Sequence, residues 1–207
     1  MFQHLYHLTD ARNWPSIERA GLLSTRRLLE RTNISEAERR LIGREHRPAS
    51  LPLPDGVIIN DQKPMPPNRL ARALIGLTVS DWYALLNSKV FFWPNESRLM
   101  AHQRAYSHIK HVVLTFDASR LIARYASTIT LSAINTGSTQ HKPALRGNAT
   151  FVPFDTWRRS GWLAEYQGLP RTPRNRPCAP AELTVADAVP DAMTYLIDVR
   201  THEPRAG

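Results

Sequence analysis

The chain has 207 residues, of which 42% are hydrophobic and 22% are charged, so it is long and apolar enough to bury one core. This composition excludes a disordered or collagen-like protein. Lysine and arginine outnumber aspartate and glutamate by 27 to 18, which gives a formal net charge of +9. The single cysteine excludes an internal disulfide and a cysteine-based zinc cluster.

The sequence shows no sign of a membrane segment. No run of residues reaches the roughly 18 apolar positions of a membrane span. The polar segment MFQHLYHLTD lacks the basic and then apolar layout of a signal peptide. We therefore expect one domain over residues 1–207 that stays in the cytoplasm and has no membrane partner.

The first part of the chain is predicted to be a strand followed by two helices. Residues 2–8 alternate in side-chain character, which is typical of a strand. Thr9 or Asp10 can cap the first helix, and Gly21 ends it. Ser35 is followed three residues later by a glutamate, and this capping box begins the second helix.

The remainder of the chain is predicted to contain short strands, helices and two irregular segments. Six prolines predict a loop over 48–70, with a strand-like island at 57–60. Ser80 can cap a short helix, and residues 155–180 form a second Pro/Arg-rich loop. We expect strands at 89–93, 111–117, 127–135, 150–154, 181–189 and 194–200, and helical segments at 97–106 and 119–125. This mixture predicts an α+β fold with a mostly antiparallel sheet.

The basic excess is mostly arginine, which makes up 23 of the 27 basic residues. Arginine binds phosphate bidentately and stacks on bases, so a polyanionic partner is a reasonable hypothesis. Residues 141–176 carry seven basic and two acidic residues, a local net charge of +5. A high net charge also serves solubility, which leaves the ordinary alternative open. The candidate nucleic-acid contacts in this stretch are Lys142, Arg158, Arg159, Arg171 and Arg174.

Common catalytic signatures are absent from the sequence. There is no Gly-rich phosphate loop, no G-x-S-x-G elbow and no H-E-x-x-H pair. The eight histidines do not combine with acidic residues at the spacing of metal ligands, so we expect no metal site.

Two segments can carry ligand contacts. Strand geometry places His7 and Thr9 on the same face, where both can hydrogen-bond one ligand. A surface histidine beside a helix cap would show the same pattern. In the second segment, Phe91 and Trp93 share one face of a strand while Phe92 points the other way. One face is expected to pack in the core, and the other can form a platform for a flat ring.

Glu182 stands at the start of an apolar strand. A half-buried carboxylate beside Leu183 and Val185 is costly unless it is paired or used, although a glutamate at a solvent-facing strand edge is equally ordinary. Polar glycine turns at 135–139 and 145–148 can present backbone N–H groups and Arg146 to a phosphate. Ordinary hairpin turns have the same composition.

Taken together, these segments resemble the DarT-type DNA ADP-ribosyltransferases. Y-H-L-T followed by W-P-S-I-x-x-A-G-L-L is similar to the opening of that family, and A-E-L-T-V is similar to the segment that carries its catalytic glutamate. The chain also resembles an uncharacterised bacterial branch of the same superfamily. That second resemblance rests on D-Q-K-P-M at 61–65, V-F-F-W at 90–93, I-N-x-G at 134–137 and R-G-x-x-T-F at 146–151.

The resemblance implies a single-domain ADP-ribosyltransferase-like fold, with a split, mostly antiparallel sheet and peripheral helices. It implies NAD⁺ as the substrate, a nucleic-acid base as the acceptor, DNA in preference to RNA, and an antitoxin protein as a possible partner. The resemblance assigns the role of the catalytic carboxylate to Glu182. The NAD⁺-binding residues that it implies are Tyr6, His7, Thr9, Phe92, Trp93 and Asn135.

The resemblance is incomplete at the catalytic arginine. The segment W-P-N-E-S-R-L-M departs from the Pro-Arg-x-Pro-Met pattern of the family. Arg146 is the first candidate for this role, and Arg72 and Arg98 are the others.

Two other functions fit parts of the same pattern. An RNA 2′-phosphotransferase shares the fold and opens with a Tyr-His-Gly-Thr-like segment, but Leu8 stands here in place of the glycine. A non-catalytic nucleic-acid-binding module is the second alternative. An effect of NAD⁺ on the melting temperature distinguishes a protein that binds NAD⁺ from one that does not.

Overall fold

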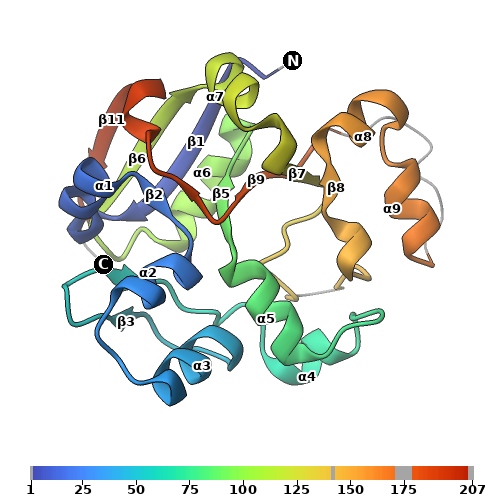
Figure 1. Cartoon of the computed structure of the whole chain (residues 1–207), viewed down its shortest axis with the longest axis horizontal. Helices are drawn as coiled ribbons and strands as arrows, with labels where there is room; N and C mark the ends of the chain where they lie inside the picture. Colours follow the sequence, from blue (N-terminus) through green and yellow to red (C-terminus); the bar gives the residue numbers. More distant parts are fainter. Residues whose placement is uncertain (1, 141–142, 171–178, 205–207) are drawn as a thin grey trace.

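Two antiparallel sheets form the centre of the molecule (Figure 1). The computed structural model describes residues 2–140, 143–170 and 179–204. The first sheet has the strand order β1-β6-β11 and the second has the order β5-β9-β7-β8. Their strands are β1 (His4–Asp10), β6 (His111–Asp117), β11 (Leu196–His202), β5 (Lys89–Phe92), β9 (Glu182–Ala186), β7 (Ile129–Ser132) and β8 (Val152–Pro153). Two short ribbons join β10 (Ala188–Val189) to β2 (Leu22–Leu23) and β3 (Leu51–Pro52) to β4 (Ile58–Ile59).

The two sheets meet where β1 passes the end of β5. The backbone N–H of Tyr6 donates to the carbonyl of Trp93 at 2.9 Å, and the N–H of Trp93 donates back to Tyr6 at 2.8 Å. This exchange makes one split antiparallel sheet out of two parts. The predicted α+β class and the mostly antiparallel pairing are therefore confirmed.

Nine α-helices surround the sheets in the described part of the chain. They are α1 (Trp14–Ala20), α2 (Thr25–Arg31), α3 (Glu36–Arg44), α4 (Pro67–Ala71), α5 (Val79–Asn87), α6 (Glu96–Ala105), α7 (Ala118–Tyr125), α8 (Phe154–Ser160) and α9 (Leu163–Gly168). Figure 1 shows α8 and α9 together beyond β8, and α2 and α3 grouped beside α5. Among the described residues, no helix combines the length and the apolar character that a membrane crossing requires.

The four-stranded sheet has one apolar face and one polar face because its strands alternate. The apolar face packs into the main core with Val90, Phe92, Ile129, Leu131, Leu183 and Val185. Glu182 and Thr184 lie on the other face of β9, where the register sets them opposite Ser132 and Thr130 of β7. The strand pairing thus presents Glu182 on the face away from the main core.

Helix α6 covers the three-stranded sheet on the face opposite the main core. Leu99 of α6 is buried against Leu8 of β1 and Val113 of β6. Tyr6, Trp93 and Tyr106 pack around this small cluster. The alternation of β1 therefore sends Leu5 into the main core and Leu8 under α6.

Several predicted boundaries are confirmed by the cap geometry. Asp10 accepts the N–H of Arg12, and a helix ends at Gly21, whose φ of +72° lies in the left-handed region. Ser35 and Glu38 form the expected capping box at the start of α3.

Other predictions were wrong in detail. The helix assigned to Ser80 begins at Val79, because Thr78 and Asp81 form a complete capping box whose cap residue lies two residues before Ser80. The predicted loop at 155–180 contains most of α8 and all of α9, and the predicted loop at 48–70 contains β3 and most of α4. The strand expected inside that loop at 57–60 is confirmed as β4. Burial of Phe154 and Trp162 in the main core supplies the stability that local propensity did not indicate.

Gly21 is the turn that brings α1 next to the C-terminal part of the chain. A Cβ atom there would lie 2.3 Å from the carbonyl oxygen of Val189, whereas a Cβ at Gly56, which also has positive φ, meets nothing within 4 Å. We expect Gly56→Ala to lower the free energy of unfolding by about 1 kcal/mol through backbone strain alone. Gly21→Ala should cost roughly 2 kcal/mol more, because the clash adds to the strain. Urea unfolding measures both, and equal losses would contradict this account.

Candidate functional site

A cavity of about 520 Å³ opens between the two sheets and brings together residues from both ends of the chain. His7 of β1 and Glu182 of β9 both line it, although they are separated by most of the sequence. The segment 57–65, the turn after β7 and helix α6 contribute further walls. Its volume is within the range of about 300–1,000 Å³ that is usual for small-molecule sites.

Glu182 is buried, with 3% of its surface exposed, and its carboxylate is held by one residue. The backbone N–H of Thr136 donates to Oε1 at 3.0 Å, and the Thr136 hydroxyl donates to Oε2 at 2.7 Å. Burial raises the pKa of Glu182 to about 7, against the opposing effects of the Thr136 hydrogen bonds and of the charges on Arg146 and Arg98. The carboxylate therefore changes its charge close to neutral pH.

Arg146 lies behind this carboxylate. Its side chain is 1% exposed, and it donates from Nη1 to the carbonyl of Thr136 at 3.0 Å and from Nε to the carbonyl of Ala144 at 3.1 Å. It is not among the residues of the cavity wall. The expected contact between Arg146 and a ligand is therefore corrected: Arg146 positions Thr136, which in turn holds Glu182.

His7 is fixed in one orientation by the aromatic strand. Its Nδ1 lies 2.9 Å from the carbonyl oxygen of Phe91, so Nδ1 carries the proton and Nε2 is the acceptor of the neutral ring. Burial lowers the pKa of His7 from its ordinary value, against the hydrogen bond to Phe91, which raises it. The imidazole is therefore neutral at physiological pH.

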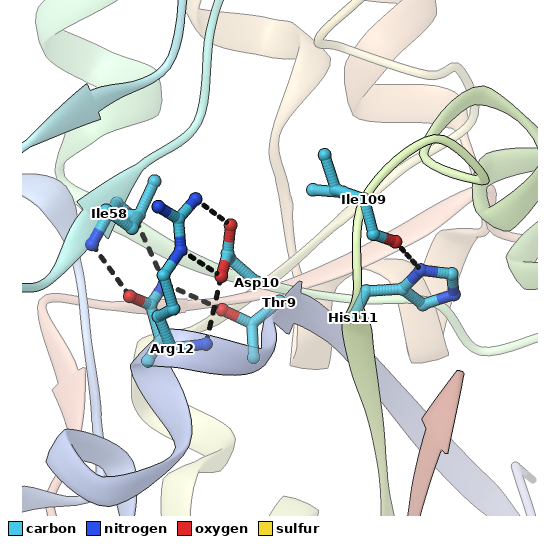
Figure 2. A network of polar contacts seen from close by, with 7 residues as sticks. Thr9, Asp10, Arg12, Ile58, Ile109 and His111 are labelled. Atoms are coloured by element: carbon cyan, nitrogen blue, oxygen red, sulfur yellow. Dashed lines mark hydrogen bonds and ion pairs between the residues drawn. The ribbon is translucent and has the colours of Figure 1, made fainter. Parts of the chain in front are cut away.

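Thr9 and its neighbours tie the end of β1 to the segment after β3 (Figure 2). The Thr9 hydroxyl oxygen accepts a hydrogen bond from Nδ2 of Asn13 at 2.9 Å. Asn13 also exchanges two hydrogen bonds with the backbone of Ile58, at 2.9 and 2.7 Å. Figure 2 also shows the Arg12 guanidinium against the carboxylate of Asp10, a contact that lowers the pKa of Asp10. This network fixes one wall of the cavity and leaves the hydroxyl proton of Thr9 available.

The aromatic residues of β5 and Trp93 lie on two faces, as their alternation predicts, but not all of the residues expected to contact a ligand reach the cavity. Phe91 and Trp93 line the cavity. Phe92 is fully buried in the main core, edge-on to Phe116, so the expected role of Phe92 beside a ligand is corrected. Tyr6 packs in the cluster under α6 and is not on the cavity wall, so its expected contact is corrected too.

The other predicted residues are scattered. Asn135 lies on the cavity wall, where its side chain accepts the N–H of Gly137. Arg98 also lines the cavity, whereas Arg72 does not. Arg158 and Arg159 are exposed on α8, away from the cavity wall. Lys142, Arg171 and Arg174 fall outside the described residues.

Sequence reasoning missed Arg47. This side chain lines the cavity at 9% exposure and donates hydrogen bonds to three uncharged oxygens. The acceptors are the carbonyls of Ile42 at 2.6 Å and Asn60 at 3.3 Å, and Oδ1 of Asn87 at 3.1 Å. No carboxylate among the described residues forms an ion pair with it, and burial lowers its pKa to about 10. No motif in the sequence distinguishes Arg47 from the many other arginines.

The raised pKa of Glu182 predicts a pH-dependent stability. Between the ordinary pKa of 4.5 and about 7, the folded protein binds one more proton than the unfolded chain. The free energy of unfolding therefore falls as the pH rises through this window, by about 3 kcal/mol. Glu182→Gln lacks this titrating group, so its free energy of unfolding should fall less than that of the wild type between pH 5 and 8. Urea unfolding measures this difference. Glu18→Gln, at an exposed position on α1, is the control and should follow the wild type. The same pH dependence in Glu182→Gln and the wild type would refute the assignment.

The comparisons with known proteins give a family but no activity. The chain matches the model of a family of unknown function, DUF7002, over residues 3–196. No curated protein and no solved structure matches the chain. Since the matched segment covers nearly all of the sequence, the chain belongs to the DUF7002 family.

Proposed function

We propose that this protein is an NAD⁺-dependent ADP-ribosyltransferase that modifies a base of nucleic acid, with DNA favoured over RNA. The observation that carries the proposal is that Glu182 and His7, from opposite ends of the chain, line the same cavity. The segments around these two residues are also the ones that resemble the DarT-type enzymes.

In the proposed reaction, the bond between ribose C1′ and the nicotinamide nitrogen breaks. Nicotinamide leaves with the electron pair, which neutralises the charge of its ring. A lone pair on the acceptor base then forms a new bond to C1′, and the proton displaced from the base passes to solvent. Positive charge develops on the ribose in between, as in glycoside hydrolysis. The protein therefore needs a fixed negative charge beside C1′.

Glu182 suits this task. Its carboxylate lies in a buried site, where electrostatic interactions are stronger than in water. Thr136 fixes its orientation with one hydrogen bond to each oxygen. A carboxylate offers about four acceptor positions, so each oxygen keeps room for a ribose hydroxyl.

The neutral groups of β1 suit the uncharged parts of the substrate. Nε2 of His7 accepts a hydrogen bond, and the hydroxyl of Thr9 donates one. Ribose hydroxyls and the nicotinamide carboxamide offer the complementary groups. Phe91, next to His7 on the cavity wall, offers a ring face for the nicotinamide.

Arg47 is the arginine that we propose for the pyrophosphate. A buried charge is costly when no anion contacts it directly. The hydrogen-bond acceptors of Arg47 in the described chain are all uncharged, and the carboxylate of Asp61 acts on it through its charge without forming an ion pair. A phosphate anion in the cavity would supply the direct ionic contact that Arg47 lacks among the described residues. This proposal replaces the role that the sequence pattern gave to Arg146.

The acceptor and the partners rest on charge and on the resemblance. A net charge of +9, carried mostly by arginine, favours a phosphate-rich partner such as a nucleic acid. A base must be single-stranded or flipped out of the stack to reach a buried carboxylate. A cytoplasmic location and an antitoxin partner belong to the same proposal.

Glu182→Gln tests the catalytic carboxylate. The substitution keeps the size of the side chain but removes its charge, so nicotinamide release should fall by about 10²–10³-fold. The assay uses NAD⁺ and a single-stranded oligonucleotide, with mass spectrometry to detect the added ADP-ribose. For the wild type, kcat/KM should rise about tenfold per pH unit below pH 7 and then level off, because the ionised carboxylate is required.

Two results would count against this proposal. Full activity of Glu182→Gln would remove the carboxylate from the mechanism. If NAD⁺ raised the melting temperature of the wild type but neither nicotinamide nor a modified oligonucleotide appeared, the protein would be a binding module.

Arg47→Gln tests the pyrophosphate contact. We expect KM for NAD⁺ to rise about ten- to a hundredfold, since hydrogen bonds to charged groups contribute about 1.5–3 kcal/mol. Nicotinamide release from nicotinamide riboside, which has no phosphate, should change little. Arg72→Gln, at an exposed position outside the cavity, is the control. Equal losses with both substrates would indicate that Arg47 only supports the fold.

A further inference from the structure

Three aromatic rings in series form one wall of the cavity. The ring of His102 on α6 lies 4.9 Å from the ring of Trp93 and 4.8 Å from the ring of Tyr106, between centroids. All three residues line the cavity that contains Glu182. Trp93 follows β5 and Tyr106 follows α6, so this wall joins the sheet to the helix.

The polar atoms of these rings are available to a ligand. Neither ring nitrogen of His102, nor Nε1 of Trp93, nor the hydroxyl of Tyr106 has a hydrogen-bond partner among the described residues. Elsewhere in the cavity, the side chains of Thr9, Arg47 and Glu182 are held by neighbouring groups. Free ring donors and acceptors beside stacked rings fit a planar heterocycle that has hydrogen-bonding edges.

The wall is also uncharged. Burial, with smaller contributions from the charges of His7 and His111, lowers the pKa of His102 to about 4. The neutral imidazole offers one donor and one acceptor. A neutral surface of this kind suits a base and does not suit a phosphate.

A cation stands beside the wall. Arg98 lies one helical turn before His102 on α6, lines the cavity and is exposed. Its charge acts on Glu182, and no carboxylate among the described residues forms an ion pair with it. A strand whose base enters the wall would therefore have a partner for the adjacent phosphate.

We propose that the Trp93–His102–Tyr106 wall binds the acceptor base of a single-stranded nucleic acid, with Arg98 on the neighbouring phosphate. This inference rests on the proposed function, because it places the acceptor beside the carboxylate that would activate NAD⁺. Phe91 is then left for the nicotinamide, and Trp93 serves the acceptor. The wall is bordered by the exposed helix α6, which gives a strand access from the surface.

Binding of two oligonucleotides tests the wall directly. The probes are a mixed-sequence single-stranded DNA of 12 nucleotides and an abasic strand of the same length. Fluorescence anisotropy measures the Kd of each probe. The wild type should bind the strand with bases about ten- to a hundredfold more tightly, which is the gain expected from stacking. His102→Ala should lose most of this preference, and His102→Phe, which keeps a ring, should retain it.

The controls separate the wall from the NAD⁺ site and from the fold. Met100→Ala alters an exposed residue of the same helix that is outside the cavity wall, and it should keep the preference. NAD⁺ should still raise the melting temperature of His102→Ala. The proposal would be overturned if His102→Ala still preferred the strand with bases. It would also be overturned if His102→Ala kept that preference while NAD⁺ no longer raised its melting temperature. A wild type that prefers bases but releases no nicotinamide would refute the transferase and leave the base site standing.

Discussion

The candidate site depends on a carboxylate that the fold keeps out of water. Glu182 stands at the start of β9, opposite Ser132 of β7, where only 3% of its surface is exposed and it lines the cavity. Thr136 holds both of its oxygens, and Arg146 holds Thr136. Burial nevertheless raises its pKa, so the arrangement costs stability at neutral pH. A fold tolerates such a cost most readily where the charge has a use.

Around this carboxylate the cavity is divided by chemistry. Neutral hydrogen-bonding groups come from β1, a buried cation comes from Arg47, and aromatic rings come from β5 and α6. A dinucleotide has parts that match the first two kinds of surface, and a base matches the third. The family to which the chain belongs has no assigned function, so these matches of chemistry, with the resemblance to the DarT-type enzymes, are the basis of the proposed activity.

The sequence predicted what depends on local pattern. Alternation identified the strand of His7, an apolar run identified the strand of Glu182, and cap signals identified Asp10, Gly21 and Ser35. It could not predict the order β5-β9-β7-β8, because the pairing of distant strands leaves no local signal. The same limit applied to Arg47 and to Arg146, whose roles depend on which oxygens surround a guanidinium after folding. The helix α8 was missed because tertiary burial of Phe154, rather than propensity, stabilises it.

The seam between the two sheets joins the two halves of the cavity. His7 belongs to one sheet and Glu182 to the other, and the backbone exchange between Tyr6 and Trp93 joins the two sheets beside them. Side chains from both sheets, among them Leu114 and Phe92, also share the main core, so the seam is held by packing as well as by hydrogen bonds. This join therefore sets the position of the imidazole relative to the carboxylate, and one of its two residues, Trp93, also belongs to the cavity wall.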